Sequence, residues 1–290
     1  MKQVIVTITI NKPTKAIELF ERMQGWDLVV IGDKKTPNDY KLNRGLYVPP
    51  AAQEKYDKPL SDAIGWNCIQ RRNFGLLLAH DMSADIIAVV DDDNIPYENW
   101  GKNLLIGKEN NIKTFDPEID VFDPVGATNY THLWHRGFPI QYLQKRNYNK
   151  SFKKIINPDI QADFWNGDPD IDAICRMEHT PDCNFASSYF PFTSTKLAPF
   201  NSQNTFLSKK CLKDYFLFPH VGRMDDIWAS YYVQSKGYKV LFNAASVYQE
   251  RNPHDLTKDM KNEYLGYENN HKIIKDLKKD PESLLSLIHI

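Results

Sequence analysis

The sequence predicts an α/β fold: a mainly parallel, doubly wound sheet followed by a less regular second half. Two observations support this prediction. Segments rich in β-branched residues alternate with segments of helical periodicity through the first third of the chain, which is typical of β-α-β units. Polar residues follow each of the predicted strands, at the ends where ligands collect in sheets of this kind.

The first third contains three predicted strands, at residues 3–10, 27–31 and 85–90. A helix is expected from Thr14, which can cap it, to about Met23, because apolar residues recur there at helical spacing. A second helix is expected over residues 62–80, and a polar loop that contains prolines over about 33–60. The β-α-β-α-β order then implies parallel strands.

The second half is less regular and is rich in proline and aromatic residues. A helix over residues 225–236, a strand over 238–242 and a final helix are expected there. The sequence contains neither a repeat nor a linker, so we expect a single domain over residues 1–285. The closing LSLIHI matches the translation of an adaptor used in sequencing libraries, so residues 285–290 are treated as a non-native scar and left out of the fold prediction.

Composition narrows the classes of function. Hydrophobic residues make up 42% of the chain and charged residues 25%, as in ordinary globular proteins. The formal net charge of -1 does not favour nucleic acid as a partner. The four cysteines are far apart and form no CxxC pair, so a zinc or disulfide framework is not expected. Without an apolar run of membrane-spanning length or a recognisable signal peptide, the chain is expected to be cytoplasmic.

Three adjacent aspartates follow the strand at residues 85–90. Like charges this close are stabilised when a cation neutralises them or when one of them is protonated. Because side chains alternate along an extended segment, Asp91 and Asp93 face the same way, and Asp92 faces the other way, toward internal hydrogen bonds. Two carboxylates suit Mg²⁺ or Mn²⁺, which take their remaining ligands from substrate phosphates. The alternative is a solvated turn or a helix cap.

Several stretches of the chain resemble the STELLO-type probable glycosyltransferases of plants and their microbial relatives. They are WDLVVIGDKKTP, IGWNCIQRRNFGLLLAH, ADIIAVVDDDNIPY, FWNGDPDIDAICR, PFNSQNTFLS, MDDIWASYYVQ and YQERNPHDL, and they span about residues 3–270. The resemblance implies a GT-A fold, with a nucleotide-binding half over about residues 1–110 and an acceptor half over about 111–285. A more distant resemblance, through the DDD strand end, is to the reversibly glycosylated polypeptides, which are UDP-arabinopyranose mutases. Unlike the plant proteins, this chain shows no N-terminal membrane anchor, so Golgi residence is not expected.

The resemblance also implies an activity. A sugar would pass from a nucleotide-diphosphate donor, UDP-linked, to a hydroxyl of a glycan or other acceptor, with Mn²⁺ or Mg²⁺ held by Asp91 and Asp93. The ribose hydroxyls are an alternative partner for Asp91, and Asp92 is counted among the donor-site residues. His254 is expected to be a third metal ligand, because many GT-A enzymes use a C-terminal histidine; a structural role is the alternative.

Further donor-site residues are expected near the ends of the first two strands and on the second helix. Asp33 is placed to accept hydrogen bonds from uracil or ribose, although it also suits a Gly-Asp turn. Thr7 and Asn11 offer polar groups near the nucleobase, although threonine is also common in strands. Either Arg71 or Arg72 is expected to contact the diphosphate, since arginine binds phosphate in bidentate fashion; a solvated helix face is the alternative.

The acceptor half contains three polar clusters. Asp225 and Asp226 open the helix at residues 225–236, where GT-A enzymes commonly have an acidic residue that is the base in inverting enzymes; Asp226 is favoured for that role, with helix capping as the alternative. The other two clusters are expected to contact the donor sugar or the acceptor: Asp168, Asp170 and Asp172 in WNGDPDID, and Asn201, Gln203 and Asn204 in PFNSQNTF. For the loop aspartates, turn formation is the alternative.

The sequence leaves other functions open. A mutase would interconvert ring forms of a UDP-sugar and would need no acceptor. A nucleotidyltransferase usually has a glycine-rich phosphate loop after its first strand, which TINKPTKA lacks. A catalytically inactive domain would bind sugars or partner proteins without turnover.

Overall fold

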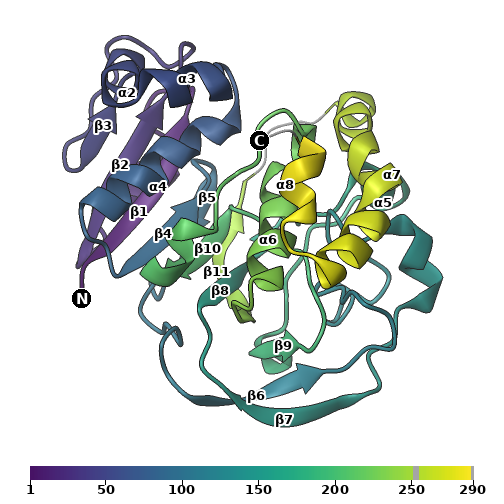
Figure 1. The fold of residues 1–290 in the computed structure, drawn as a ribbon. Coiled ribbons are helices and arrows are strands. Elements are labelled where there is room, and N and C mark those ends of the chain that lie inside the picture. The colour runs from purple at the N-terminus through teal and green to yellow at the C-terminus, as the bar shows by residue number, and fades with distance from the viewer. Residues whose placement is uncertain (251–254, 289–290) are drawn as a thin grey trace.

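A computed structural model describes residues 1–250 and 255–288 of the chain. Within these residues one sheet of eleven strands forms the centre of the molecule, in the order β3-β2-β1-β4-β10-β8-β11-β9-β6-β7, with β5 paired to β11. Figure 1 shows this sheet running through the whole molecule. The strands are β1 Gln3–Thr9, β2 Trp26–Gly32, β3 Leu46–Val48, β4 Ile86–Val90, β5 Asn94–Pro96, β6 Asn110–Phe115, β7 Ser151–Ile156, β8 Ile160–Gly167, β9 Phe192–Ser194, β10 Asn204–Ser208 and β11 Val240–Gln249.

The direction of the strands decides where a ligand can bind. Strands β3, β2, β1 and β4 are parallel to one another. Strand β10 is antiparallel to β4 and to β8, and β8 is parallel to β11. The carboxyl ends of β1, β2, β4, β8 and β11 and the start of β10 therefore lie along one edge, which we call the carboxyl edge. The predicted α/β class and its parallel sheet are confirmed, and the antiparallel strands lie in the half predicted to be less regular.

The helices are short except for α7. They are α1 Lys15–Phe20, α2 Pro50–Tyr56, α3 Lys58–Ile64, α4 Arg72–Asp81, α5 Ala173–Glu178, α6 Asp225–Ser235, α7 Leu256–Lys279 and α8 Ser283–Ile288, with 3-10 turns η1 Ile69–Arg71, η2 Ile140–Lys145, η3 Ser187–Tyr189, η4 Lys209–Lys213 and η5 Gly222–Met224. None of these helices is both long and apolar enough to cross a membrane. Thr14 caps α1 as predicted, its hydroxyl accepting from the Ile17 amide at 3.3 Å.

Two predicted elements in the first third are wrong. The polar loop expected over residues 33–60 contains β3 and α2, and α3 begins just before its end. Pro50 opens α2, and Asp57 caps α3 by accepting from the Leu60 amide at 2.9 Å. The helix expected from residue 62 starts at Arg72 instead, because Gly65 (φ +77°) ends α3 and Asn67 (φ +60°) reverses the chain.

The N-terminal half of the core depends on close packing of α4 against the sheet. Val4, Val6, Val29 and Ile31 are completely buried in β1 and β2. Gly75 of α4 faces them, and a methyl group added there would lie 2.3 Å from Cγ1 of Val6. The absent side chain therefore allows α4 to approach the sheet, and so fixes the position of residues at its N-terminal end.

We expect Gly75→Ala to lower the free energy of unfolding by about 1–3 kcal/mol, because the added methyl group overpacks a rigid, β-branched neighbour. The gain in helix propensity, about 1 kcal/mol, works against this loss. Urea unfolding measures the change. Gly266→Ala in α7 is the matched control, since its methyl group would meet the flexible Met224 side chain, whose Sδ lies 2.3 Å away and can move. Equal effects of the two substitutions would contradict this account of the packing.

Candidate active site

A pocket of about 340 Å³ lies at the carboxyl edge. It is lined by Ile8, Thr9, Ile10, Asn11, Asp33, Asn67, Cys68, Ile69, Arg72, Asp91, Asp92 and Asp93. These residues come from the ends of β1, β2 and β4 and from the turn that leads into α4. The structure thus brings together the DDD run, Asp33, Asn11 and one of the two arginines. Thr7 is not among the lining residues; it is buried within β1.

The middle aspartate of the run holds the end of β1. The Thr9 hydroxyl donates to Oδ2 of Asp92 at 2.5 Å, and the side-chain amide of Asn11 donates to the same oxygen at 3.2 Å. The Thr14 hydroxyl donates to the Asp92 carbonyl. Asp92 therefore makes the internal hydrogen bonds that join β4 to β1 and α1.

Asp91 forms an ion pair with Arg72, whose Nη2 lies 2.5 Å from Asp91 Oδ1. The Arg72 side chain is only 1% exposed. Its Nη1 donates to the carbonyl and to the hydroxyl of Ser202, at 2.9 and 2.8 Å. A guanidinium in this position joins α4, the end of β4 and the segment before β10, and places a positive charge beside the DDD pocket.

The neighbouring Arg71 points elsewhere. It is completely buried, and it donates to Gln53 Oε1 at 2.9 and 2.7 Å and to Ser61 Oγ at 3.0 Å. The guanidinium also lies 3.6 Å from the centre of the Trp66 ring. Burial lowers the pKa of Arg71 from its usual value. Arg71 thus packs α2 and α3 against η1, and of the two arginines Arg72 is the one that lines the pocket.

Asp33 holds in place the turn that forms another wall of the pocket. Its Oδ1 accepts from the backbone amides of Lys34 and Asn67 at 2.6 and 2.9 Å, and its Oδ2 from Cys68 at 3.1 Å. The side chain is 1% exposed. These bonds hold the turn at residues 65–68 in place, so that Asn67 and Ile69 reach the pocket.

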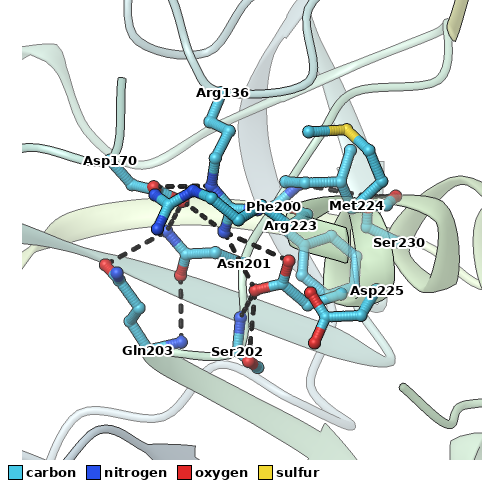
Figure 2. Close-up of polar contacts among 12 residues, drawn as sticks. Arg136, Asp170, Phe200, Asn201, Ser202, Gln203, Arg223, Met224, Asp225 and Ser230 are labelled. Carbon is cyan, nitrogen blue, oxygen red and sulfur yellow. Dashed lines mark hydrogen bonds and ion pairs between the residues drawn. The ribbon is translucent and has the colours of Figure 1, made fainter. Parts of the chain in front are cut away.

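Behind the pocket a buried chain of alternating charges runs into the second half of the protein, and Figure 2 shows its central part. Oδ2 of Asp226 accepts from the amide and the hydroxyl of Ser202, at 2.9 and 3.1 Å. Arg136 Nη2 lies 3.2 Å from the same oxygen. The guanidinium also forms two hydrogen bonds with Asp170, at 2.8 and 3.0 Å. We call Asp91, Arg72, Ser202, Asp226, Arg136 and Asp170 the charge chain.

Within the charge chain, Arg136 joins Asp226 to Asp170. Burial alone would lower its pKa, but the charges of Asp170 and Asp226 outweigh burial and raise the pKa above its usual value. Asn201 Nδ2 donates to Asp170 at 2.9 Å, and the backbone amide of Gln203 donates to Asn201 Oδ1 at 3.1 Å. Asn201 and Gln203 are therefore tied to the charge chain, just before the start of β10.

No model of a protein family matches the chain. The chain is 24% identical over 253 residues to "Probable glycosyltransferase STELLO1" of Arabidopsis thaliana, covering 80% of this chain and 33% of that protein. It is 23% identical over 185 residues to "Probable glycosyltransferase STELLO2" of the same plant, covering 60% and 24%. The resemblance to STELLO-type probable glycosyltransferases is confirmed. The chain spans about a third or less of the length of these relatives.

Solved structures are more distant. The crystal structure of A197 from STIV matches with a TM-score of 0.38 and 10% identity, over 85% of this chain and 83% of that one. Glucosyl-3-phosphoglycerate synthase from Mycobacterium tuberculosis, in complex with phosphoglyceric acid, matches with a TM-score of 0.42 and 11% identity, over 100% and 80%.

Asp225, the other carboxylate at the start of α6, lies beside the charge chain. It is buried, and its Oδ2 accepts from Gln70 Nε2 at 3.1 Å. Burial, and then the charge of Asp226, raise the pKa of Asp225 to about 7. The two carboxylates at the start of α6 thus differ in their surroundings: Asp226 is paired with Arg136, whereas burial raises the pKa of Asp225.

The remaining predicted residues have structural contacts. Asp172 caps α5 and accepts from Trp134 Nε1 at 2.6 Å, and burial raises its pKa to about 7. Asp168 is paired with Arg176. Asn204 accepts from Trp100 Nε1 and donates to Ser246 Oγ, both at 2.9 Å. Asp172 and Asn204 are therefore buried residues with structural partners, whereas Asp168 remains partly exposed. His254 lies outside the described residues.

Sequence reasoning missed Arg136, Gln70 and Asn67. Arg136 stands in THLWHRGFP, a mostly apolar stretch whose single arginine was a usable signal, since a buried arginine requires an acidic partner. Gln70 and Asn67 carried no such signal, because their position depends on the turn that Asp33 holds.

We expect Asp225→Asn to become more stable relative to the wild type as the pH rises from about 4 to 7. The raised pKa means that the folded protein keeps this proton over a range in which the unfolded chain has lost it, so wild-type stability falls through that window and is lowest above it. Asparagine has no proton to lose. Urea unfolding at several pH values measures the difference. Asp62→Asn, at an exposed position in α3, is the control, and a pH-independent difference for Asp225→Asn would refute the argument.

Proposed function

We propose that this chain is a metal-dependent glycosyltransferase that moves a sugar from a UDP-linked donor to an acceptor hydroxyl. This proposal rests mainly on the pocket at the carboxyl edge, where Asp91 and Asp93 lie beside the buried Arg72. The names of the two plant relatives support the class of reaction. The donor, the metal and the role of each residue are inferred from the chemistry of the pocket.

The pocket has the chemistry of a nucleotide site. Ile10 and Ile69 are large apolar side chains that line it and remain 49% and 39% exposed, which is costly in water unless a ligand covers them. A flat nucleobase suits such walls. Asn11 and Asn67 add exposed side-chain amides, which can both donate and accept hydrogen bonds at the edge of uracil.

The diphosphate is assigned to the DDD end of the pocket. Asp91 and Asp93 offer only oxygen ligands. Among the described residues, no three or more His, Cys, Asp or Glu side chains are grouped so that they could hold a metal ion by themselves. This donor set fits Mg²⁺ or Mn²⁺, which complete their coordination with water and phosphate oxygens. The ion, when bound, would neutralise charge on the departing diphosphate. Arg72 holds Asp91 in position and supplies a second positive charge to the phosphates.

The proton of the acceptor hydroxyl is assigned to Asp226. Ser202 and Arg72 connect this carboxylate to the pocket, and Arg136 forms an ion pair with it, so that a carboxylate oxygen is held where it can accept a proton. Asp225, with a pKa raised to about 7, is the alternative base. Asp226 is positioned through Arg136 by Asp170, together with Asn201 and Gln203. Within the acidic loop, the partly exposed Asp168 is the residue that we assign to sugar hydroxyls.

The first test is calorimetric binding of UDP with and without Mn²⁺. We expect binding that requires Mn²⁺ in the wild type and a loss of about a hundredfold or more in Asp93→Asn, because a ligand of the ion is removed. Asp116→Asn, at a carboxylate outside the pocket, is the control and should bind like the wild type. Metal-independent binding, or none, would overturn the proposal. Product analysis with UDP-sugars then separates transfer to an acceptor from ring interconversion by a mutase.

A second test uses the two adjacent arginines as matched variants. We expect Arg72→Lys to weaken binding of UDP with Mn²⁺ by about tenfold, because lysine keeps the charge but loses the forked geometry. Arg71→Lys should retain UDP affinity and instead lower the free energy of unfolding by about 1–3 kcal/mol, since its buried hydrogen bonds lie outside the pocket. Calorimetry and urea unfolding on both variants measure this. The reverse pattern would reassign the phosphate contact.

A further inference from the structure

A second cavity, of about 460 Å³, lies at the edge of the sheet opposite the carboxyl edge. Val240, the first residue of β11, lines it, as do residues of β6, β7 and β9. The last residues of α6, with Gln234 and Ser235, and the C-terminal part of α7 also border it. Figure 1 shows β6 and β7 at the bottom of the molecule, far from α2 and α3 beside the first pocket. This cavity is therefore a separate site.

The register of the strands brings the polar side chains that line this cavity to one face of the sheet. Thr114 of β6 lies directly opposite Thr193 of β9, and Lys154 of β7 lies opposite Ile112. Because residues two apart on a strand share a face, Lys154, Thr114 and Thr193 all face the cavity. Ser194 follows and accepts from the Lys196 amide at 3.0 Å, which leaves its hydroxyl proton available to a ligand.

The cavity carries an excess of positive charge. Lys154, Lys196, Lys239 and Lys278 line it together with a single carboxylate, Asp120. Lys278 is paired with Asp120 at 2.7 Å, and in the described part of the chain the other lysines form no such ion pair. This excess is local, because the whole chain has a net charge of -1. An excess of lysines around a concave surface attracts an anion.

The end of α6 does not account for Lys196 and Lys239, whereas Lys278 lies in the last turn of α7. Cations are often found near the C-terminal carbonyls of helices, which carry partial negative charge. At the end of α6, however, the Tyr232 carbonyl already accepts from the Lys236 amide at 3.2 Å and from the Ser235 hydroxyl at 2.7 Å. The Gln234 carbonyl accepts from the Gly237 amide at 2.9 Å. These two carbonyls are satisfied without the lysines of the cavity.

The remaining walls are apolar and include Ile156, Ile274 and Leu277. A cavity with lysines, hydroxyls, an amide and an apolar wall matches a small ligand that combines a phosphate with a polyol ring, since the C–H face of a sugar packs on aliphatic side chains. We propose that this cavity binds a phosphorylated sugar or polyol at a site distinct from the donor pocket. The proposal does not depend on the function proposed above.

The test uses the full chain and two probes, glucose 1-phosphate and inorganic phosphate. Their affinities are measured by calorimetry for the wild type and for the double variant Lys196→Gln with Lys239→Gln. The control is Lys209→Gln with Lys213→Gln, which removes the same charge from lysines outside the cavity. Hydrogen exchange over residues 151–156 and 192–197 locates the bound probe.

We expect glucose 1-phosphate to bind, to protect these segments from exchange, and to lose at least about tenfold in affinity in the double variant but not in the control. Equal losses in both variants would show a response to net charge and overturn the proposal. Protection confined to the DDD pocket would also overturn it, as would the absence of binding. Lower stability of the double variant without a change in affinity would assign the lysines to the fold alone.

Discussion

The ion pair between the buried Arg72 and Asp91 is the interaction on which the rest of the carboxyl edge depends. Arg72 lies at the start of α4, Asp91 directly after β4, and Ser202, the other partner of the guanidinium, before β10. A charge that is 1% exposed is stable only when it is paired and hydrogen-bonded. The helix, the central parallel strand and the antiparallel strand must therefore keep one relative position.

The charge chain extends this constraint into the second half of the protein. Asp226 shares Ser202 with Arg72, and Arg136 lies between Asp226 and Asp170. Acidic and basic groups alternate along the charge chain, so each of its three carboxylates has an arginine beside it. Beside the charge chain, burial and then the charge of the adjacent Asp226 raise the pKa of Asp225. Packing and electrostatics thus give two adjacent aspartates different surroundings.

The two cavities differ in a way that follows from the direction of the strands. At the carboxyl edge the parallel strands end in acidic residues, which suit a metal ion and a nucleotide. At the opposite edge the strands of the second half present lysines and hydroxyls. The sheet therefore separates an acidic site from a basic one, and each can be altered by substitution without contact with the other.

The sequence alone determined the α/β class, the strands β1, β2 and β4, the helix α6 and the position of the DDD run, because β-branching, apolar spacing and turn residues are local signals. It did not show α2 and α3, whose short apolar patterns lie in a stretch dominated by proline and charge. Nor could it separate Arg71 from Arg72, which are adjacent in the chain but whose guanidinium groups have different partners. Tertiary structure decided that difference, since Gly75 lets α4 approach the sheet and orients its N-terminal end. The partners of Arg136 could not be predicted for a similar reason: they are 34 and 90 residues away, and only the folded sheet brings their charges together.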